Sequence, residues 1–580
     1  MNKLILTLSL SLLTLSVNAN PITPAQAKKK AEKTLRAIRK ADIDVVPVGI
    51  PTEVNSRITG EGGSDAYYIF NADDREGFVI VAADDNMPSI LAYSDTGVFP
   101  ADGDMPDGLI GFLEFCSEYQ EDVRQGLAPA VKLADEEATV IVAPLMTTRW
   151  GQDAPYNYYC PSPKGGQGNC PVGCVATAMA QIMYKWHWPA TGKGAVSYTS
   201  ENAGGVLEVD FTQSTYRWDL LQDSYPTLFK NVEKRDAIAK LCYDCGVACR
   251  MNYGAGSSGT HDQYAIRAYY TNFGYKASTI DLLYRDCYAT QEEWNNVIKR
   301  ELRAGRPFQF SAASASGSGR DAGGHSYVID GYDSNDFVHV NWGWDGRYNA
   351  YYAINVMDGG NYQFSEDQSI VVGIQPDYDG VEETPRQHRL YLMTPLTTEA
   401  TSIDLDGSFT VILGEFYNMS PYANRFTIGI GLYDLEGNLL ENVLDESNSK
   451  NEYVTMNYPA WSGFSEYGRA YCKLSGKKYP AGDYYLRFMC LQDGYDNFIL
   501  PDVSGGGEKN NLIHAYIHDG KLFFNQVSTG ISSVEDDAEV LGVERYTIDG
   551  KATDASSKGI VVERQKMANG KTRSVKRLSF

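Results

Sequence analysis

The sequence has little cysteine, little histidine and few positive charges for a chain of 580 residues. Its ten cysteines are too sparse for a disulfide-based scaffold. Acidic residues outnumber Lys and Arg by 74 to 51, and this net charge of −23 argues against a nucleic-acid partner, which would require a basic face. With 43% hydrophobic and 22% charged residues the chain can bury real cores, which excludes wholesale disorder.

Long apolar runs are also missing beyond the first residues, so no transmembrane segment is expected. Residues 1–19 combine Lys3, an apolar run and the small residues around Ala19 in a pattern typical of a cleaved secretory signal. We therefore expect a secreted protein, either extracellular or at the cell surface. Export permits disulfides, but a working thiol among ten cysteines would leave at least one other cysteine unpaired.

Composition divides the rest of the chain into four regions and a linker, and the fold class is α+β. Residues 20–136 open with a basic helical stretch and continue through strand-like runs. Residues 137–376 mix helical and strand patterns, and residues 377–388 form a polar linker. Short alternating runs across 389–527 predict an antiparallel β-sandwich. Two β-like runs with Asp-Gly and Asn-Gly turns favour a small folded sheet over a disordered tail at 528–580.

The strongest local pattern is QGNCPVGCVATAMAQIMYKWHWP, which predicts a helix that begins at Cys174 and ends at Pro189. Gly173 precedes the helix, so the Cys174 thiol would lie at its N-terminus. Free backbone N–H groups and the helix dipole favour a thiolate there and lower the thiol pKa. This pattern indicates a nucleophilic cysteine.

A thiolate nucleophile requires a base, and the seven histidines leave two candidates, His325 and His339, in one strand–turn–strand segment. If the turn centres on Asp333, His325 faces Asn341, whose amide would fix the imidazole tautomer. Trp342 would then shield that hydrogen bond from water. His339 lies on the same face, so geometry alone does not exclude it, but we favour His325.

Further residues complete an acyl-transfer site. The Cys174 backbone N–H and the Gln152 side chain are candidate donors to a developing oxyanion. Gly324, just before His325, leaves room for a substrate backbone. No phosphate loop or convincing metal spacing is present, so no cofactor and no metal are expected. The three cysteines of LCYDCGVACR continue an apolar helix face and are interpreted as core rather than as zinc ligands: Cys242, Cys245 and Cys249.

The segments GCVATAMAQIMYKWHWP, YGAGSSG, GGHSYVIDGYD and VHVNWGWDG, in this order, resemble the streptopain family of secreted bacterial cysteine peptidases. The resemblance spans about 137–376 and implies a papain-like catalytic domain. Carried over residue by residue, it implies Cys174 as nucleophile, His325 as general base and acid, and Gln152 as oxyanion donor. It places Asn341 and Trp342 beside the histidine and makes His339 a structural neighbour. It also implies a substrate cleft bordered by four residues: Gly256, Ser257, Ser258 and Gly259.

The resemblance continues on both sides of this domain. Residues 20–136 resemble the family's inhibitory propeptide, which implies a zymogen that is cleaved between about 125 and 145. Residues 528–580 resemble a type IX secretion sorting domain, which implies export across the outer membrane by that machinery. Val561 stands where an aromatic residue is common in that pattern.

Two functions follow as hypotheses. The first is a secreted cysteine endopeptidase that hydrolyses peptide bonds in protein substrates through a thioester on Cys174 and is inhibited by its own propeptide. The alternative is a surface-binding or adhesion protein in which the peptidase domain is vestigial and the sandwich at 389–527 binds the partner. Vestigial enzymes usually lose the nucleophile or the base, and this chain has both.

Overall fold

A computed structural model describes residues 21–49, 66–101, 103–133, 138–227, 229–313, 324–357, 368–381, 383–451, 455–464, 468–505 and 508–525, and four strands within 540–579. The expected signal sequence at 1–19 lies outside these residues. The chain divides into two compact units, Met1–Asn525 and Gln526–Phe580.

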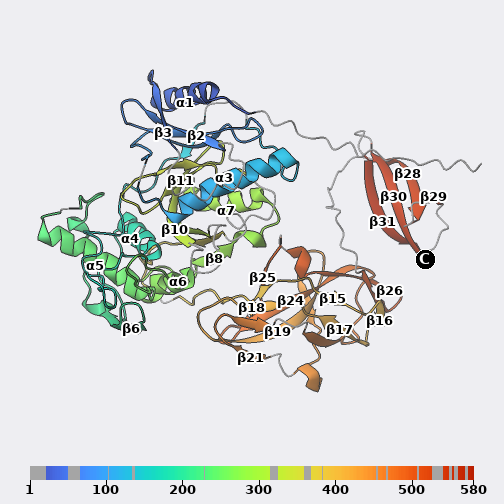
Figure 1. The fold of residues 1–580 in the computed structure, drawn as a ribbon. Helices are drawn as coiled ribbons and strands as arrows, with labels where there is room; N and C mark the ends of the chain where they lie inside the picture. Colours follow the sequence, from blue (N-terminus) through green and yellow to red (C-terminus); the bar gives the residue numbers. More distant parts are fainter. Residues whose placement is uncertain are drawn as a thin grey trace, which may run out of the picture. The chain divides into compact units, whose positions relative to one another are not determined.

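The N-terminal region of the first unit is an antiparallel sheet covered by a helix (Figure 1). The helix, α1 (Pro24–Arg39), begins at a capping box in which Thr23 and Gln26 each accept the other's backbone N–H. Its buried side chains recur at helical spacing and pack on the sheet: Ala27, Ala31 and Leu35. The strands are β1 (Val45–Val48), β2 (Tyr67–Ala72), β3 (Phe78–Ala82) and β4 (Ile90–Ser94).

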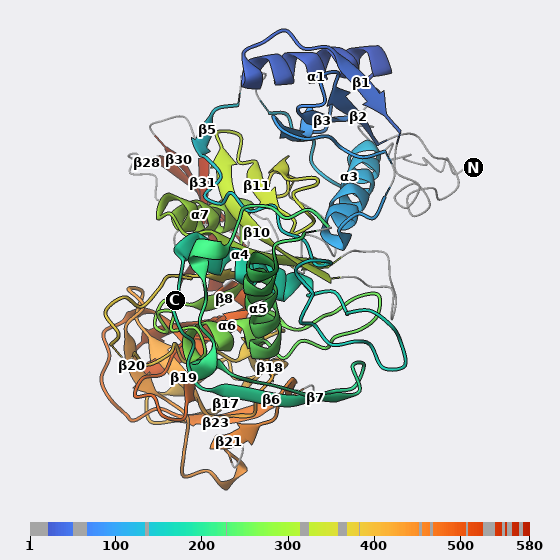
Figure 2. The same cartoon turned by 90° about the vertical axis from the view of Figure 1, so that its left-hand side faces the viewer.

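This sheet continues without a break into the following region. β4 pairs antiparallel with β12 (Ala350–Tyr352), so one 11-stranded sheet joins both regions (Figure 2). Tyr93 on β4 donates a 2.7 Å hydrogen bond to Asp333 and stacks on Tyr351 with ring centroids 5.1 Å apart. The other strands are β5 (Val140–Val142), β8 (Asp281–Tyr284), β9 (Phe308–Ala313), β10 (Gly324–Asp333), β11 (Val338–Asn341) and β13 (Ser369–Val372).

Helices cover both faces of this sheet. Tyr327 and Ile329 on β10 join a core with α3 (Asp107–Gln125) and α7 (Gln291–Arg303), whereas Val328 joins a second core on the opposite face. That second core is formed with α4 (Cys174–Trp186), α5 (Val232–Ala248) and α6 (Asp262–Thr271). The interpretation of the three clustered cysteines as core is confirmed, because all three are buried there: Cys242, Cys245 and Cys249. All ten cysteines are free thiols.

The region after residue 388 consists of short strands around one hydrophobic core, as the alternating runs predict. Pairing is antiparallel except between β14 and β25, which are parallel. The strands are β14 (Tyr391–Leu392), β15 (Thr397–Thr398), β16 (Ser402–Asp404), β17 (Ser408–Ile412), β18 (Phe416–Asn418), β19 (Asn424–Tyr433), β20 (Leu439–Asn442), β21 (Thr455–Tyr458), β22 (Ser462–Phe464), β23 (Arg469–Lys473), β24 (Gly482–Gln492), β25 (Asp502–Val503), β26 (Ile513–His518) and β27 (Lys521–Asn525). We refer to residues 389–525 as the sandwich.

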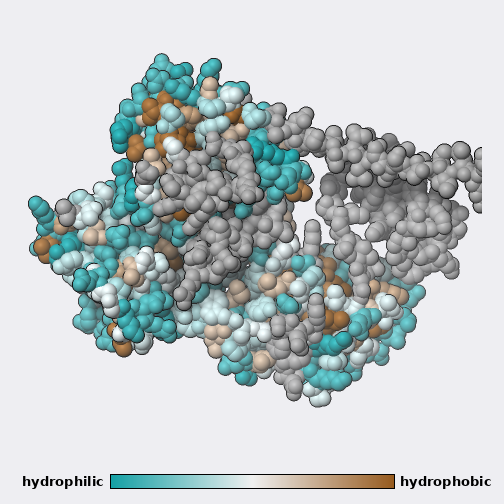
Figure 3. All heavy atoms as spheres, viewed as in Figure 1, coloured by the Kyte–Doolittle hydropathy of each residue, from teal (hydrophilic) through white to brown (hydrophobic). Residues whose placement is uncertain are grey.

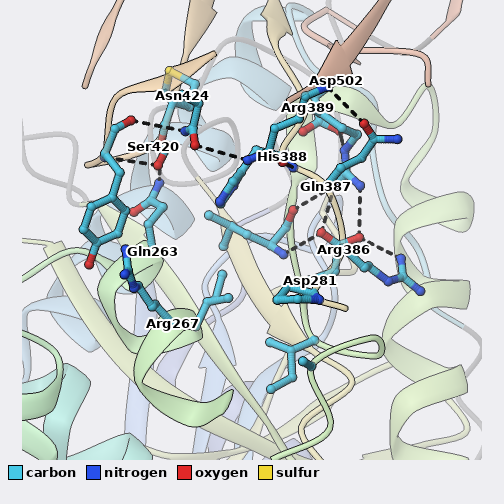
Figure 4. A pocket seen from close by; sticks show the side chains of 18 of the residues that line it. Gln263, Arg267, Asp281, Arg386, Gln387, His388, Arg389, Ser420, Asn424 and Asp502 are labelled. Atoms are coloured by element: carbon cyan, nitrogen blue, oxygen red, sulfur yellow. Dashed lines mark hydrogen bonds and ion pairs between the residues drawn. The ribbon is translucent and has the colours of Figure 1, made fainter. Parts of the chain in front are cut away.

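The predicted linker is held against the peptidase-like region by ion pairs. Glu383 pairs with Lys276 at 3.0 Å, and Arg386 pairs with Asp281 at 2.9 Å. Arg389 then bonds both Asp281, at 3.0 Å, and Asp502, at 2.6 Å (Figure 4). These bonds tie the first residues of the sandwich to β8. A polar linker sequence therefore forms a fixed seam rather than a loose connection.

The second unit is a four-stranded antiparallel sheet, which confirms the predicted small sheet in place of a disordered tail. Its strands are β28 (Val540–Thr547), β29 (Ala552–Thr553), β30 (Gly559–Met567) and β31 (Thr572–Ser579).

The described surface is mainly hydrophilic on the face drawn in Figure 3, where apolar side chains gather only in small separate patches. Among the described residues no helix has the length and apolar character needed to cross a membrane.

Replacement of Arg389 tests the seam. Arg389→Ala leaves the half-buried carboxylate of Asp502 without its cation, which should cost about 3 kcal/mol in the free energy of unfolding at neutral pH. Burial raises the pKa of Asp502 to about 6 in spite of Arg389. A carboxyl with a raised pKa destabilises the fold once it ionises. The difference in the free energy of unfolding between the wild type and Arg389→Ala should therefore become smaller as the pH falls below about 6 and Asp502 is protonated.

Urea unfolding at pH 7.5 and pH 5 measures both effects. Arg386→Ala is the matched control, because that side chain is 53% exposed and its ion pair should contribute less than about 1 kcal/mol. Equal losses in the two variants at both pH values would show that Arg389 does not hold the seam.

Candidate active site

Cys174 is the first residue of α4, as the sequence pattern predicts. Gly173 before it has a φ of +91°, a backbone conformation that residues other than glycine rarely adopt. A Cβ at Gly173 would lie 2.6 Å from the Met251 sulfur and 2.9 Å from the Ser258 carbonyl oxygen. Glycine is therefore required both by the conformation and by the close approach of two neighbours. The chain turns there, and the Cys174 backbone N–H stands at the helix N-terminus.

His325 is the partner of this cysteine. It lies on β10, is only 4% exposed, and is hydrogen bonded to the Cys174 thiol. Its Nε2 lies 2.9 Å from the backbone carbonyl oxygen of Trp342. Because a carbonyl only accepts, Nε2 must carry a hydrogen, which leaves Nδ1 for the thiol. The sequence left His325 and His339 open, and the structure pairs His325 with Cys174.

The two groups shift each other's pKa in opposite directions. Burial raises the pKa of the Cys174 thiol, but the hydrogen bond and charge of His325 outweigh it, and the pKa ends below its ordinary value. Burial lowers the pKa of His325, but Cys174 and the Trp342 carbonyl outweigh it, and that pKa ends above its ordinary value. Both shifts act in the direction of a thiolate–imidazolium pair.

The predicted pairing of His325 with Asn341 is wrong. In the hairpin of β10 and β11, Asn341 faces Val328, and the register shifts again between Ile329 and Gly331 at a bulge. The turn also closes later than expected, since the Asp333 N–H bonds the Phe337 carbonyl. A simple turn centred on Asp333 could not account for the extra residues in the loop and the bulge.

Asn341 instead fixes the backbone next to His325. Its Nδ2 donates to the Thr148 carbonyl at 2.7 Å, and its Oδ1 accepts the Gly343 N–H at 3.1 Å. These bonds span Trp342 and hold its carbonyl in place. The Trp342 side chain is fully buried, with its ring centroid 6.3 Å from that of His325 and its Nε1 bonded to the Tyr348 carbonyl. Trp342 thus both covers His325 and supplies the acceptor that the sequence analysis assigned to Asn341.

Gln152 lies beside the approach to the nucleophile. Its carbonyl accepts the Val172 N–H at 2.9 Å, two residues before Cys174. This bond places Gln152 next to the N-terminus of α4, where an oxyanion donor has to stand.

Ser258 of the predicted cleft border lies beside Gly173, the residue before Cys174, because its carbonyl oxygen would be 2.9 Å from a Cβ at Gly173. Gly259 pairs with Asn252 in an isolated β-bridge, which closes the loop that also contains Gly256 and Ser257. Gly324 is exposed at the start of β10, next to His325. His339 is directed elsewhere, with its Nδ1 bonded to Asp330 at 2.6 Å.

The contacts between the start of α3 and the site were not predicted from the sequence. Gly108, in the first turn of α3, packs against His325: a Cβ there would lie 3.2 Å from the His325 Cβ and 2.9 Å from the Trp342 ring. Asp107 beside it adds to the upward shift of the His325 pKa. Asp104 just before the helix accepts a 3.1 Å hydrogen bond from Trp344. No local pattern signals these contacts, because they join residues more than 200 positions apart.

Family models match two parts of the chain. Residues 150–352 match the Peptidase C10 family, and residues 19–123 match the Spi protease inhibitor family. These two stretches contain all the contacts between α3 and His325 described above.

Curated relatives are similar to most of the same stretch. Streptopain of Streptococcus pyogenes is 31% identical over 343 residues, which cover 55% of this chain and 82% of streptopain. The thiol protease/hemagglutinin PrtT of Porphyromonas gingivalis is 29% identical over 398 residues, which cover 65% of this chain. The chain spans only 44% of the length of PrtT. A solved fragment of prointerpain A from Prevotella intermedia matches with 28% identity and a TM-score of 0.46, over 59% of this chain and 100% of the fragment.

The pairing of Cys174 with His325 predicts a pH profile for alkylation. Thiolates react and thiols do not, so Cys174 should reach half of its maximal rate with iodoacetamide below the ordinary thiol pKa of about 8.5. In His325→Ala the thiol loses the hydrogen bond and the charge that offset most of the effect of burial, so the midpoint should rise by roughly one pH unit or more.

Peptide-level mass spectrometry of labelled Cys174 across pH 5–10 measures this midpoint. His339→Ala is the matched control, because that ring bonds Asp330 and not the thiol. A midpoint that does not move in His325→Ala would exclude the thiolate–imidazolium pair.

Proposed function

Because the chain belongs to the Peptidase C10 family of cysteine proteases and carries an inhibitor domain before its peptidase domain, we propose that it is a secreted endopeptidase made as a zymogen. The observation that supports this function is the bonded pair of Cys174 and His325, held in one tautomer by the Trp342 carbonyl. We propose Cys174, His325 and Gln152 as catalytic residues, and Asn341 and Trp342 as positioning residues.

The proposed reaction passes through a thioester. The Cys174 thiolate attacks the carbonyl carbon of the scissile peptide bond, and the negative charge that forms on the oxygen is stabilised by the Cys174 N–H and the Gln152 side chain. The His325 imidazolium then donates its proton to the leaving amine as the C–N bond breaks. Neutral His325 next takes a proton from water as the water oxygen attacks the thioester carbon. The C–S bond then breaks, which releases the new carboxyl group and restores the Cys174 thiolate and the His325 imidazolium.

The inhibitory action that we propose for residues 20–136 is occlusion of the cleft. Gly108 packs against the Cβ of His325 and the Trp342 ring, so the first turn of α3 lies beside the general acid. The catalytic pair itself stays bonded underneath. The inhibitor region also supplies four strands to the peptidase sheet, which keep α3 at this position. Proteolytic removal of the region would therefore expose a site that is already assembled.

We further propose that residues 1–19 direct export and that residues 528–580 act as a type IX sorting domain. Support comes from the apolar run and small residues at 1–19, and from the folded sheet in place of a disordered tail. Substrate proteins, the secretion machinery and the chain's own inhibitor region are then its partners. The alternative of an adhesion protein with a vestigial peptidase domain has less support, because both members of the catalytic pair are present and bonded.

Intact mass over time tests the peptidase function. The wild-type chain should shorten itself to begin between about residues 125 and 145 and then cleave casein, whereas Cys174→Ala should remain at full length. Trace trypsin, added to both proteins, tests whether another protease has to make the first cut. A trypsin-cut wild type that leaves casein intact and does not react at Cys174 would refute the function.

Substitution of Gly108 tests the proposed occlusion. Gly108→Ala adds a Cβ 2.9 Å from the buried Trp342 ring, an overpacking that costs about 1–3 kcal/mol and loosens α3 from the site. Self-processing should then be about tenfold faster, measured as the half-time of the full-length band.

Gly49→Ala is the matched control in the same region, since a Cβ there meets no atom within 4 Å. Processing of Gly108→Ala at the rate of this control would show that α3 does not block the site.

A further inference from the structure

Trp461 is an unusual residue at the surface of the sandwich. It lies in the turn between β21 and β22 and is 42% exposed, although it is a large aromatic side chain. Its φ is +54°, a left-handed conformation that costs a bulky residue free energy and persists only when the surroundings enforce it. The Trp461 N–H bonds the Ser420 carbonyl at 3.1 Å, which fixes the turn. A strained, exposed and fixed tryptophan requires an explanation.

The Trp461 ring lies against the peptidase domain. Its centroid is 4.8 Å from that of His261, an exposed residue just before α6. His261 follows Ser258 by three residues, and the Ser258 carbonyl touches Gly173 beside the nucleophile. At about 3.3 Å for each extended residue, three residues reach at most about 10 Å. Trp461 therefore lies within reach of a peptide bound at Cys174.

The chemistry of the reaction tells which part of a peptide reaches Trp461. His325 has to protonate the leaving amine, so the residues after the scissile bond lie on the His325 side of the nucleophile. The acyl part, which precedes the scissile bond, must extend in the other direction, along Gly173 and Ser258. His261 and Trp461 continue that direction. With about 3.3 Å for each residue, the side chains three to five positions before the scissile bond are those within reach.

The seam holds the sandwich in the position that this requires. Tyr422, near Trp461, packs edge-on against Tyr264 with ring centroids 5.6 Å apart, and Arg267 lies 4.3 Å above its ring. Gln263 donates to the Met419 carbonyl at 3.3 Å. Figure 4 shows Gln263 and Arg267 of α6 on the same side of a 290 Å³ cavity as Ser420 of the sandwich. These three contacts of α6 fix the loop between β18 and β19, whose Ser420 carbonyl accepts the Trp461 N–H.

The charges near Trp461 restrict what it can bind. Arg267 is stacked on Tyr422, and the positive charge of Arg250 also acts on that phenol. A lysine or arginine side chain of a substrate would be repelled by both. An indole and an imidazole offer flat apolar surface instead, which suits an aromatic or large aliphatic side chain.

We infer that Trp461 of the sandwich and His261 of the peptidase domain form a substrate subsite for a large apolar side chain three to five residues before the scissile bond. The inference depends on the proposed endopeptidase function and extends it to the sandwich. The sandwich thereby takes part in the choice of substrate, as an element of the cleft.

Fluorogenic peptides test this subsite with the enzyme that has lost its inhibitor region by processing and retains the sandwich. All peptides share two residues before the scissile bond; one series stops there, and the others continue with Phe, Lys or Gly at the third to fifth positions. The wild type should prefer Phe over Gly about tenfold in kcat/KM at one of these positions, and Lys should be the poorest. In Trp461→Ala this preference should fall to about twofold, and Trp461→Phe should restore most of it.

Several controls separate the possible failures. Leu435→Ala, another exposed apolar residue of the sandwich, should retain the wild-type preference. Because Trp461→Phe and Trp461→Ala place a non-glycine residue at the same φ, backbone strain is matched between them. An unchanged Phe preference in Trp461→Ala, an equal loss in Leu435→Ala, or a wild-type preference for Lys would each overturn the subsite. A wild type that cleaves none of the peptides, the short series included, would instead refute the peptidase function.

Discussion

The hydrogen bond between His325 Nε2 and the Trp342 carbonyl is the constraint on which the rest of the site depends. A backbone carbonyl cannot donate, so this bond sets the tautomer and leaves Nδ1 for the thiol. It also stabilises the protonated ring, and this stabilisation keeps the Cys174 pKa low against the effect of burial. A side-chain acceptor could rotate away, whereas this acceptor is part of the backbone. Asn341 fixes that backbone by donating to the Thr148 carbonyl and by accepting the Gly343 N–H. The orientation of the imidazole is therefore determined by the hairpin itself.

The same hairpin explains how the inhibitor region can block the site without dismantling it. β12 follows Trp342 and pairs with β4, so the inhibitor strands extend the sheet that carries His325. This sheet carries α3 to the site, where a Cβ at Gly108 would lie 3.2 Å from the His325 Cβ and only 2.9 Å from the Trp342 ring. A single Cβ would suffice to disturb the contact. The proposed inhibition and the proposed catalysis therefore depend on one continuous sheet. Removal of strands β1–β4 by processing would leave β12 as an edge strand.

Local patterns are enough to predict that Cys174 begins a helix, whereas the long-range contacts of the site cannot be predicted from them. Cys174 was identified because a helix start is visible in apolar spacing, and the position of a thiol at that start decides its chemistry. Elimination among the seven histidines leaves both His325 and His339, and the structure pairs His325 with Cys174. The partner of His325 was assigned incorrectly, since a bulge and a longer turn shift the register and neither leaves a clear mark in the sequence. The contact of Gly108 with His325 and that of His261 with Trp461 join distant segments, so no window of the sequence contains either one.

The seam also bears on why an accessory sandwich should be fixed to a peptidase at all. A loosely tethered domain could bind substrate proteins, but it could not present a side chain to the cleft at a defined distance from the nucleophile. The half-buried Arg389, with carboxylates on both sides, is a costly way to join two regions, and apolar packing would serve adhesion equally well. What an ion-paired seam adds is a defined geometry, because guanidinium and carboxylate groups meet only in a few orientations. Such a geometry is of use when a residue beyond the seam, here Trp461, has to stand at a fixed place beside the substrate.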